Sequence, residues 1–313
     1  MLPVFAFSQV EQSETLILMG SRFSFTAVAE HDSIAHASIE AGIEEVQRIE
    51  RLISSWNDSS ETSSINRNTV KGSVTISHEL FELIYRSKKV SSLTEGAFDI
   101  SFSGLDNVWR FDGSMTQVPD SQAIAASIKH INWNNIKLDR SLFTVEILEG
   151  MKIGFGGIGK GYAANKAKAA MLATGASGGV VNAGGDLTAW GRPAQDSAWG
   201  IAIANPVEPD QPIGWLNIND LSVVTSGSYE RFAMIDGVRY AHIIDPRTGW
   251  PAKGLVSVTI TCPDAELADA LATAVFVLGK ENGLALVNRL VGIECLIVDE
   301  NGNWFATDGL SIK

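Results

Sequence analysis

The chain has 313 residues, of which 45% are hydrophobic and 19% are charged, and its formal net charge at pH 7 is −12. This composition is typical of a folded globular protein, and the length suffices for one large domain or two intertwined ones. The acidic balance, without a long basic run, argues against nucleic acid as the main partner.

The N-terminal segment is unusual. Residues 1–9 are apolar and then small and polar, like the tail of a signal peptide with Ala6-Phe7-Ser8 as its cleavage site. The alternative is a short strand or a disordered tip. We therefore treat 1–14 as a residual signal-like or disordered segment and 15–313 as a single domain. No apolar run approaches the ~18 residues of a membrane span.

Alternating apolar residues predict a β-hairpin over 15–29. An amphipathic helix is expected over 33–53 and another helix over 77–93, each behind a good N-cap residue. A polar stretch over 54–68 separates them, and a glycine-containing connection over 94–101 follows the second helix.

The rest of the chain mixes strands and helices. Strands over 143–148 and 178–182 flank a helix over about 160–173, and further helices are expected over 265–278 and 281–290. The remaining predicted strands occupy 199–204, 214–218, 221–225, 238–244, 255–262, 292–298 and 303–306. Because there is no strict βαβ rhythm, we predict an α+β fold of mixed, largely antiparallel sheets with flanking helices. Two intertwined similar halves are one arrangement that such a fold allows.

A polar pair interrupts the most apolar helix of the sequence. Asp269 and Thr273 lie four residues apart in the segment 265–279, so a carboxylate and a hydroxyl point the same way. A carboxylate that faces a core is costly unless something compensates it, and a hard cation such as Mg²⁺ prefers oxygen ligands. The pair therefore predicts part of a magnesium site.

A glycine cluster over 152–161 follows a strand and opens a helix, where main-chain N–H groups suit phosphate binding. Three of its glycines match the dinucleotide fingerprint, yet no acidic residue ends a second strand ~20 residues later. The cluster also matches a P-loop, except that Gly161 replaces the final Ser or Thr. A tight turn that only packs helix against strand is the alternative. We expect phosphate contact, with Lys160 as a point charge on the ligand.

Eight short motifs give the chain a wider resemblance, because they occur in the order seen in the ApbE family. They are Met19-Gly20-Ser21, Ser54-Ser55-Trp56 with Ser63-Ser64-Ile65-Asn66, Gly96-Ala97-Phe98-Asp99, Gly156-Gly157-Ile158-Gly159-Lys160-Gly161-Tyr162, Asn182-Ala183-Gly184-Gly185-Asp186, Thr225-Ser226-Gly227-x-Tyr229-Glu230, His242-Ile243-Ile244-Asp245-Pro246-x-Thr248-Gly249 and Asp269-x3-Thr273. Each motif alone is weak, but eight in order are specific. The chain resembles the family over about 16–313, which implies an ApbE-like fold.

The ApbE family comprises FAD:protein FMN transferases, and the resemblance implies their chemistry. The protein would bind FAD and Mg²⁺, and a threonine hydroxyl of an acceptor protein would attack the FMN phosphorus while AMP leaves. The acceptor would carry a D-G-x-[ST]-[AG]-T segment. Some relatives instead, or also, hydrolyse FAD to FMN and AMP, and a non-catalytic flavin-binding protein is a further alternative.

The resemblance also implies where this protein acts and with what. It suggests the periplasm or the extracytoplasmic face of the inner membrane, whereas the cytoplasm follows if Met1 is the true start. Membrane association would arise only through partners or a missing leader, and no nucleic acid is expected as a partner.

Roles of single residues follow from the same resemblance. Asp269 and the hydroxyl of Thr273 would hold Mg²⁺ with backbone carbonyls near Gly157 and Ala272. Contacts with FAD would fall at Met19, Trp56, Ala97, Phe98, Asp99, Lys160 and Ile243.

His242 is the candidate for activating the incoming threonine, because an imidazole titrates near neutral pH. Asp245 would orient His242 or the metal shell. The structural alternatives are that His242 is a satisfied strand histidine and Phe98 a core residue. The chain departs from the family at Gly154, where many members have an acidic residue that contacts FAD, and at Ser228, where Asp is frequent.

Overall fold

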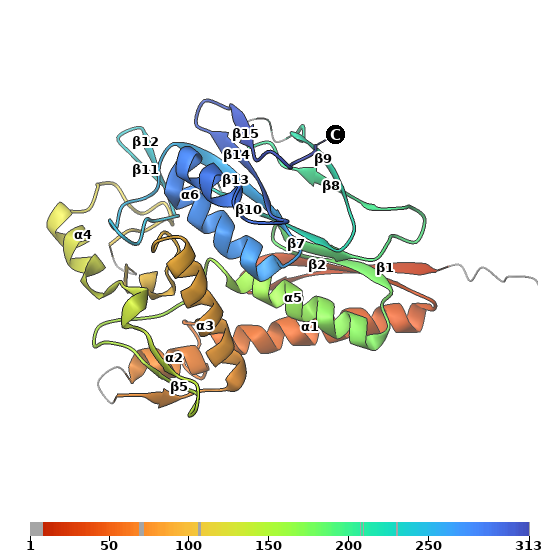
Figure 1. Ribbon diagram of the computed structural model, residues 1–313, viewed down its shortest axis with the longest axis horizontal. Coiled ribbons are helices and arrows are strands. Elements are labelled where there is room, and N and C mark those ends of the chain that lie inside the picture. Colours follow the sequence, from red (N-terminus) through yellow and green to blue (C-terminus); the bar gives the residue numbers. More distant parts are fainter. Residues whose placement is uncertain are drawn as a thin grey trace, which may run out of the picture.

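An eight-stranded sheet forms the centre of the protein in the computed structural model, which describes residues 9–68, 72–105, 108–206, 208, 210–229 and 231–312 (Figure 1). Its strand order is β1-β2-β6-β7-β10-β13-β14-β15, and these neighbours pair antiparallel. The strands are β1 (Val10–Leu18), β2 (Ser21–Ala29), β6 (Gly178–Ala183), β7 (Asp186–Trp190), β10 (Leu221–Gly227), β13 (Leu255–Cys262), β14 (Glu294–Asp299) and β15 (Trp304–Ala306). The prediction of largely antiparallel sheets is confirmed.

Three small sheets surround the large one. They pair β3 (Val74–Thr75) and β4 (Lys137–Asp139) with β5 (Thr144–Glu146), β8 (Trp199–Ile203) with β9 (Gly214–Ile218), and β11 (Phe232–Ile235) with β12 (Val238–Ala241).

Helices flank the large sheet. They are α1 (Asp32–Ile53), α2 (Glu61–Arg67), α3 (His78–Leu93), α4 (Ser121–Ser127), α5 (Gly159–Thr174) and α6 (Ala265–Val287), with 3₁₀ turns η1 (Ile100–Leu105), η2 (Ile128–His130) and η3 (Trp133–Asn135). The helices α1 and α5 pack side by side, α1 on β2 and α5 on β6, whereas α6 packs on β10 and β13 (Figure 1). The helix α5 also contacts α6, so the helices on the β2–β6 half of the sheet meet the helix on its β10–β13 half.

The first hairpin, β1–β2, forms where its sequence predicts one. Met19 and Gly20 both have positive φ, 49° and 69°, as a two-residue turn between twisted strands requires. The strand β1 begins at Val10, so it takes in residues 10–14, which we had assigned to the N-terminal segment. Residues 1–8, with the cleavage-like Ala6-Phe7-Ser8, lie outside the described residues.

The helix α6 is one long element with a break inside it. Asp264 caps it by accepting a hydrogen bond from the Leu267 N–H at 3.0 Å. Gly279 has non-helical angles (φ 77°, ψ 176°) and separates the two helical segments expected from the sequence. By length and composition α6 could cross a membrane, which we had not anticipated. Half of its most apolar window is buried against the rest of this fold.

Several sequence expectations need correction. The polar stretch 54–68 contains α2, because Ser60 caps a helix there and accepts the Ser63 N–H at 2.9 Å. The helix α4 was missed; it is short, and Ile124 is its one fully buried residue among those described. The strand expected over 238–244 ends at Ala241, since the chain then turns and Ile244 bridges to Pro251 instead.

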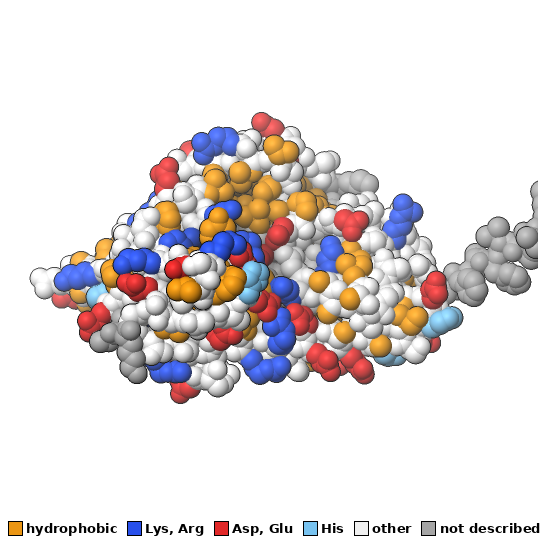
Figure 2. All heavy atoms as spheres, turned by 60° about the horizontal axis from the view of Figure 1, so that its bottom comes forward, with side chains coloured by type: hydrophobic (Ala, Val, Ile, Leu, Met, Phe, Trp, Pro, Cys, Tyr) orange, Lys and Arg blue, Asp and Glu red, His pale blue; other side chains and the backbone are white. Residues whose placement is uncertain are grey.

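The surface carries a mixture of charges. Figure 2 shows acidic and basic side chains interspersed over one face, with a group of hydrophobic side chains exposed beside them. No continuous basic stripe is visible on the face drawn.

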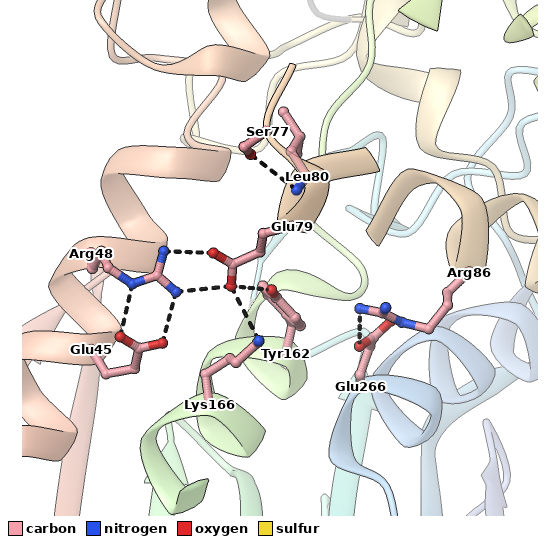
Figure 3. Close-up of polar contacts among 9 residues, drawn as sticks. All are labelled: Glu45, Arg48, Ser77, Glu79, Leu80, Arg86, Tyr162, Lys166 and Glu266. Atoms are coloured by element: carbon pink, nitrogen blue, oxygen red, sulfur yellow. Dashed lines mark hydrogen bonds and ion pairs between the residues drawn. The ribbon is translucent and has the colours of Figure 1, made fainter. Parts of the chain in front are cut away.

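Buried and half-buried ion pairs tie the helices together (Figure 3). Glu79 on α3 accepts hydrogen bonds from Arg48 of α1 at 2.6 and 2.8 Å and from the Tyr162 hydroxyl of α5 at 2.6 Å. The hydrogen bonds from Arg48 have the largest effect and, together with those from Tyr162 and Lys166, lower the pKa of Glu79 to about 2. Burial acts in the opposite direction and raises this pKa. Arg86 of α3 donates two hydrogen bonds to the carboxylate of Glu266 on α6, at 2.7 and 2.9 Å. The helix α3 therefore fastens α1, α5 and α6 to one another.

We expect Glu79→Gln to lower the free energy of unfolding at pH 7 by ~1–2 kcal/mol, because it removes charge-assisted hydrogen bonds that solvent partly screens. The folded-state pKa of Glu79 lies below its ordinary 4.5, so its contribution is complete above that pH and is lost as pH falls toward 2. Urea unfolding at pH 7 and pH 3 measures both effects. The exposed Glu44→Gln is the matched control. An equal loss for Glu79→Gln at both pH values would contradict the account.

Candidate functional site

The glycine loop that precedes α5 is held at its start by motif residues from elsewhere. The side chain of Asn66 both accepts from the Ile153 N–H at 2.8 Å and donates to the Ile153 carbonyl at 2.9 Å. The Gly154 N–H donates to the Ile100 carbonyl at 2.8 Å. These contacts give Asn66 a structural role and bring the segment 96–100 against the loop.

The departure at Gly154 has a steric reason. A β-carbon there would lie 2.2 Å from the hydroxyl oxygen of Ser103, so an acidic side chain would require Ser103 to turn to another rotamer. Ser228, the second departure, is buried, and its N–H donates to the Val256 carbonyl at 2.9 Å. Both positions therefore fit their own surroundings.

The second half of the loop lies against α6 and forms the predicted metal side of the site. The Gly161 N–H donates to the carboxylate of Asp269 at 3.0 Å, and a β-carbon at Gly157 would lie 3.0 Å from the Thr273 hydroxyl. The structure thus brings three of the four predicted metal residues together at one place. Ala272, the fourth, is fully buried on the same helix.

The environment of Asp269 fits a hard cation. The residue is 5% exposed, burial raises the pKa of its carboxyl, and the nearby Asp186 carboxylate raises it further. Compensation by a cation is the ordinary way to keep such a carboxylate charged. Within the described residues no three His, Cys, Asp or Glu side chains gather as metal ligands, so the other donors would be the Thr273 hydroxyl and main-chain oxygens.

Asp186 is a site residue whose role the sequence did not reveal. It follows the Gly184-Gly185 turn, in which both residues have positive φ, and its carboxylate lies 3.3 Å from the ammonium of Lys160. In the sequence Asp186 is only the last residue of the motif that begins at Asn182, without a role of its own, while Lys160 was expected to meet the ligand. The glycine turn was the available signal, but a pairing of β7 with α5 is not visible in local patterns.

The predicted cofactor residues fall into exposed and buried groups. Met19, at the tip of the first hairpin, has its terminal methyl 3.8 Å from where a β-carbon of Gly159 would lie. Trp56 is 85% exposed and offers a flat apolar face to solvent. Ala97 and Phe98 are buried, and Phe98 belongs to the main core, as its structural alternative proposed.

Asp99 and Ile243 are engaged inside the protein. One oxygen of Asp99 accepts from the Ser101 N–H and hydroxyl at 2.8 and 2.7 Å, and the other accepts from the Trp133 N–H at 2.9 Å. Burial raises the pKa of Asp99 against these bonds. Ile243 packs in the core cluster beneath α6, so its side chain serves the fold.

His242 is fixed from its own hairpin. Its Nδ1 lies 3.0 Å from the Arg231 carbonyl oxygen, so Nδ1 carries the proton in the neutral ring and Nε2 carries the lone pair. Asp245 was expected to orient His242 or the metal shell, but its carboxylate instead binds Arg247 at 2.8 and 2.9 Å. The orienting acceptor of His242 is therefore a main-chain carbonyl.

The turn that follows His242 reaches the glycine loop indirectly. A β-carbon at Gly96 would lie 3.9 Å from the Arg247 side chain, and the segment 96–100 contacts the loop at Gly154. The glycine loop itself is thus contacted by Asn66, by Ile100 and by α6. The turn after His242 instead lies against the neighbouring Gly96 position.

Comparisons with known proteins find relatives that match most of the chain. The sequence matches the ApbE family over residues 19–297. It is 33% identical over 279 residues to an FAD:protein FMN transferase of Treponema pallidum, covering 84% of this chain and 77% of that protein.

Two solved structures extend the comparison to the fold. A crystal structure of the ApbE protein of Thermotoga maritima has a TM-score of 0.87 at 33% identity and covers 96% of this chain and 97% of that one. The apo flavinyl transferase ApbE of Pseudomonas stutzeri has a TM-score of 0.84 at 27% identity and covers 97% and 96%.

We expect Gly161→Ala to lower the free energy of unfolding by ~2 kcal/mol or more, because the new methyl group would lie 2.1 Å from the Ala265 carbonyl oxygen. That oxygen is main chain and cannot rotate away, so the overlap outweighs the ~1 kcal/mol that alanine gains in helices. The control Gly156→Ala meets only Phe102, at 3.7 Å, and should cost much less. Urea unfolding compares the two variants, and equal stabilities would refute the close contact.

Proposed function

The chain belongs to the ApbE family, and we propose that it transfers FMN from FAD to an acceptor flavoprotein and releases AMP. The observation that carries the proposal is the meeting of Asp269, Thr273 and the glycine loop at the start of α5. The N–H groups of Gly159 and Gly161 at the start of α5 are already bonded, to the Phe155 carbonyl and to Asp269. The charge of the buried carboxylate instead attracts a cation that a diphosphate also binds. The alignment with the FAD:protein FMN transferase of Treponema pallidum covers 84% of this chain.

The proposed reaction is a displacement at phosphorus. The acceptor threonine oxygen forms a bond to the FMN phosphorus, the bond from that phosphorus to the AMP oxygen breaks, and AMP leaves. Positioning and charge neutralisation, more than covalent chemistry, decide the rate of such transfers. The threonine proton passes to the Nε2 of His242, which holds the lone pair in the tautomer set by the Arg231 carbonyl.

Mg²⁺ would be held by Asp269 and Thr273, with backbone carbonyls near Gly157 and Ala272. When bound it neutralises charge on the diphosphate. The residues of the chain supply the rest: Lys160 is a point charge for the phosphates, and the exposed Trp56 offers a stacking face to a flavin or adenine ring.

The direct test incubates the protein with FAD, Mg²⁺ and an acceptor that carries a D-G-x-[ST]-[AG]-T segment. We expect a fluorescent acceptor band on a denaturing gel. Absence of the band from a protein that demonstrably binds FAD would overturn the proposal. AMP release at a rate that the acceptor does not change would identify an FAD pyrophosphatase instead.

We expect Thr273→Val, which is nearly isosteric, to lower Mg²⁺-dependent transfer by more than ~10-fold, because losing a ligand costs at least as much as losing an outer-shell partner. The control is Thr188→Val, since Thr188 is fully buried, whereas Thr273 is half-buried, and the Thr188 hydroxyl makes no hydrogen bond. Both variants should unfold at similar urea concentrations. Full transfer activity in Thr273→Val would remove Thr273 from the metal shell.

We expect His242→Ala to lower the rate of transfer by ~10²-fold or more while FAD affinity is retained, because a general base typically contributes this much. Gel fluorescence gives the rate, and titration with FAD gives the affinity. His36→Ala, at an exposed position of α1, controls for loss of a histidine. Unchanged transfer in His242→Ala would leave His242 as a structural strand-end residue.

A further inference from the structure

Lys160 stands where a lysine is electrostatically unfavourable. It is the second residue of α5, and the first turn of this helix contains no acidic residue. The N-terminus of a helix carries a partial positive charge, so a cation there is destabilising unless it is compensated. The position would instead suit a neutral or acidic residue, and the lysine therefore calls for a reason.

The compensation comes from two carboxylates that other elements bring to the same place. The ammonium of Lys160 lies 3.3 Å from Asp186 at the start of β7, and the side chain of Asp186 is only 6% exposed. The second carboxylate is that of Asp269 on α6, which accepts a hydrogen bond from the N–H of Gly161, the residue that follows Lys160. The charge of Lys160 acts on Asp269 as well, favouring its ionised form. One ammonium thus serves two buried carboxylates.

The Lys160 side chain is able to leave this position. It is 27% exposed, and a lysine is a compact charge on a flexible stem that moves more readily than a packed group. Asp186, by contrast, is fixed by its glycine turn, in which Asn182 accepts the Gly185 N–H at 2.7 Å.

We propose that Lys160 is an internal counter-ion that ligand binding exchanges: a divalent cation held by Asp269 and Thr273 takes over the compensation of the buried carboxylates, and the released ammonium moves onto the diphosphate. Asp186 is then a positioning residue, which holds Lys160 beside the glycine loop until the phosphates arrive. The inference rests on the proposed function, because it takes the diphosphate of FAD as the ligand.

The exchange makes the two ligands help each other. Before FAD binds, Lys160 competes with the metal for the carboxylates, so the metal alone should bind weakly. With the metal in place, Lys160 is available to the diphosphate, so each ligand raises the affinity for the other. Removal of Lys160 should therefore tighten metal binding without FAD and weaken FAD binding with metal present. These opposite signs separate exchange from a simple loss of structure.

The experiment measures two affinities on the full chain. Mn²⁺, as a paramagnetic probe for the metal, is titrated without FAD, and FAD is titrated by fluorescence with saturating Mg²⁺. For Lys160→Met we expect Mn²⁺ to bind roughly fivefold tighter and FAD roughly tenfold weaker than in the unchanged protein, which is an ordinary size for coupling between sites. For Asp186→Asn we expect weaker Mn²⁺ binding, since a negative charge beside the metal site is lost and Lys160 keeps Asp269 as its one buried partner of the two.

Lys152→Met is the matched control, because it removes the same charge from an exposed position just before the loop and should change neither affinity. Lys160→Gln repeats the test with a polar side chain should Lys160→Met unfold. Unchanged or weaker Mn²⁺ binding in folded Lys160 variants would overturn the exchange, whereas FMN transfer by the unchanged protein would leave the proposed function standing. Because neither titration needs an acceptor, loss of transfer alone does not decide the outcome.

Discussion

The hydrogen bond from the Gly161 N–H to the buried carboxylate of Asp269 is the contact on which the arrangement of this protein depends. It joins α5, which packs with α1 on β2 and β6, to α6, which packs on β10 and β13. The bond lies at a helix N-terminus, where N–H groups lack helical partners and a negative charge is favoured. Glycine is required at 161 because a β-carbon would meet the Ala265 carbonyl. The closest approach of the two helices and the candidate metal site are therefore one feature.

The parts of the site that follow from local periodicity were predictable from the sequence. The four-residue spacing of Asp269 and Thr273 placed both on one helix face, and the glycine cluster predicted a helix start; that the two would meet followed only from the family resemblance. The first hairpin and the broken helix α6 were predictable for the same reason. Pairings between distant elements were not. That Lys160 meets Asp186, and that Asp245 turns back onto Arg247, depends on loop conformation, which residue patterns do not specify.

Several motif residues turn out to hold the frame. Asn66 pins the start of the glycine loop, and Asp99 ties η1 to η3 with both of its oxygens. Gly249 accepts the indole N–H of Trp109 at 2.9 Å and so fixes the turn that follows His242. A residue of a family motif can therefore have a structural role, such as holding a loop in place, instead of a direct contact with the ligand. This is why a resemblance identified the family more securely than it identified roles of single residues.

The two sides of the site differ in how they are built, and the difference suits two different substrates. Asp269 and Gly161 are buried where α5 meets α6, so the donor side of the proposed site is closely packed. His242 lies at the end of the β11–β12 hairpin, which forms its own two-stranded sheet and packs through a separate small cluster around Trp109. A dinucleotide profits from preorganised donors, because its charged groups must be matched closely. A protein acceptor must instead bring its nucleophilic hydroxyl to a base that lies near the surface. Placing the proposed base on an outlying hairpin and the proposed charge sites on packed helices meets both demands at once.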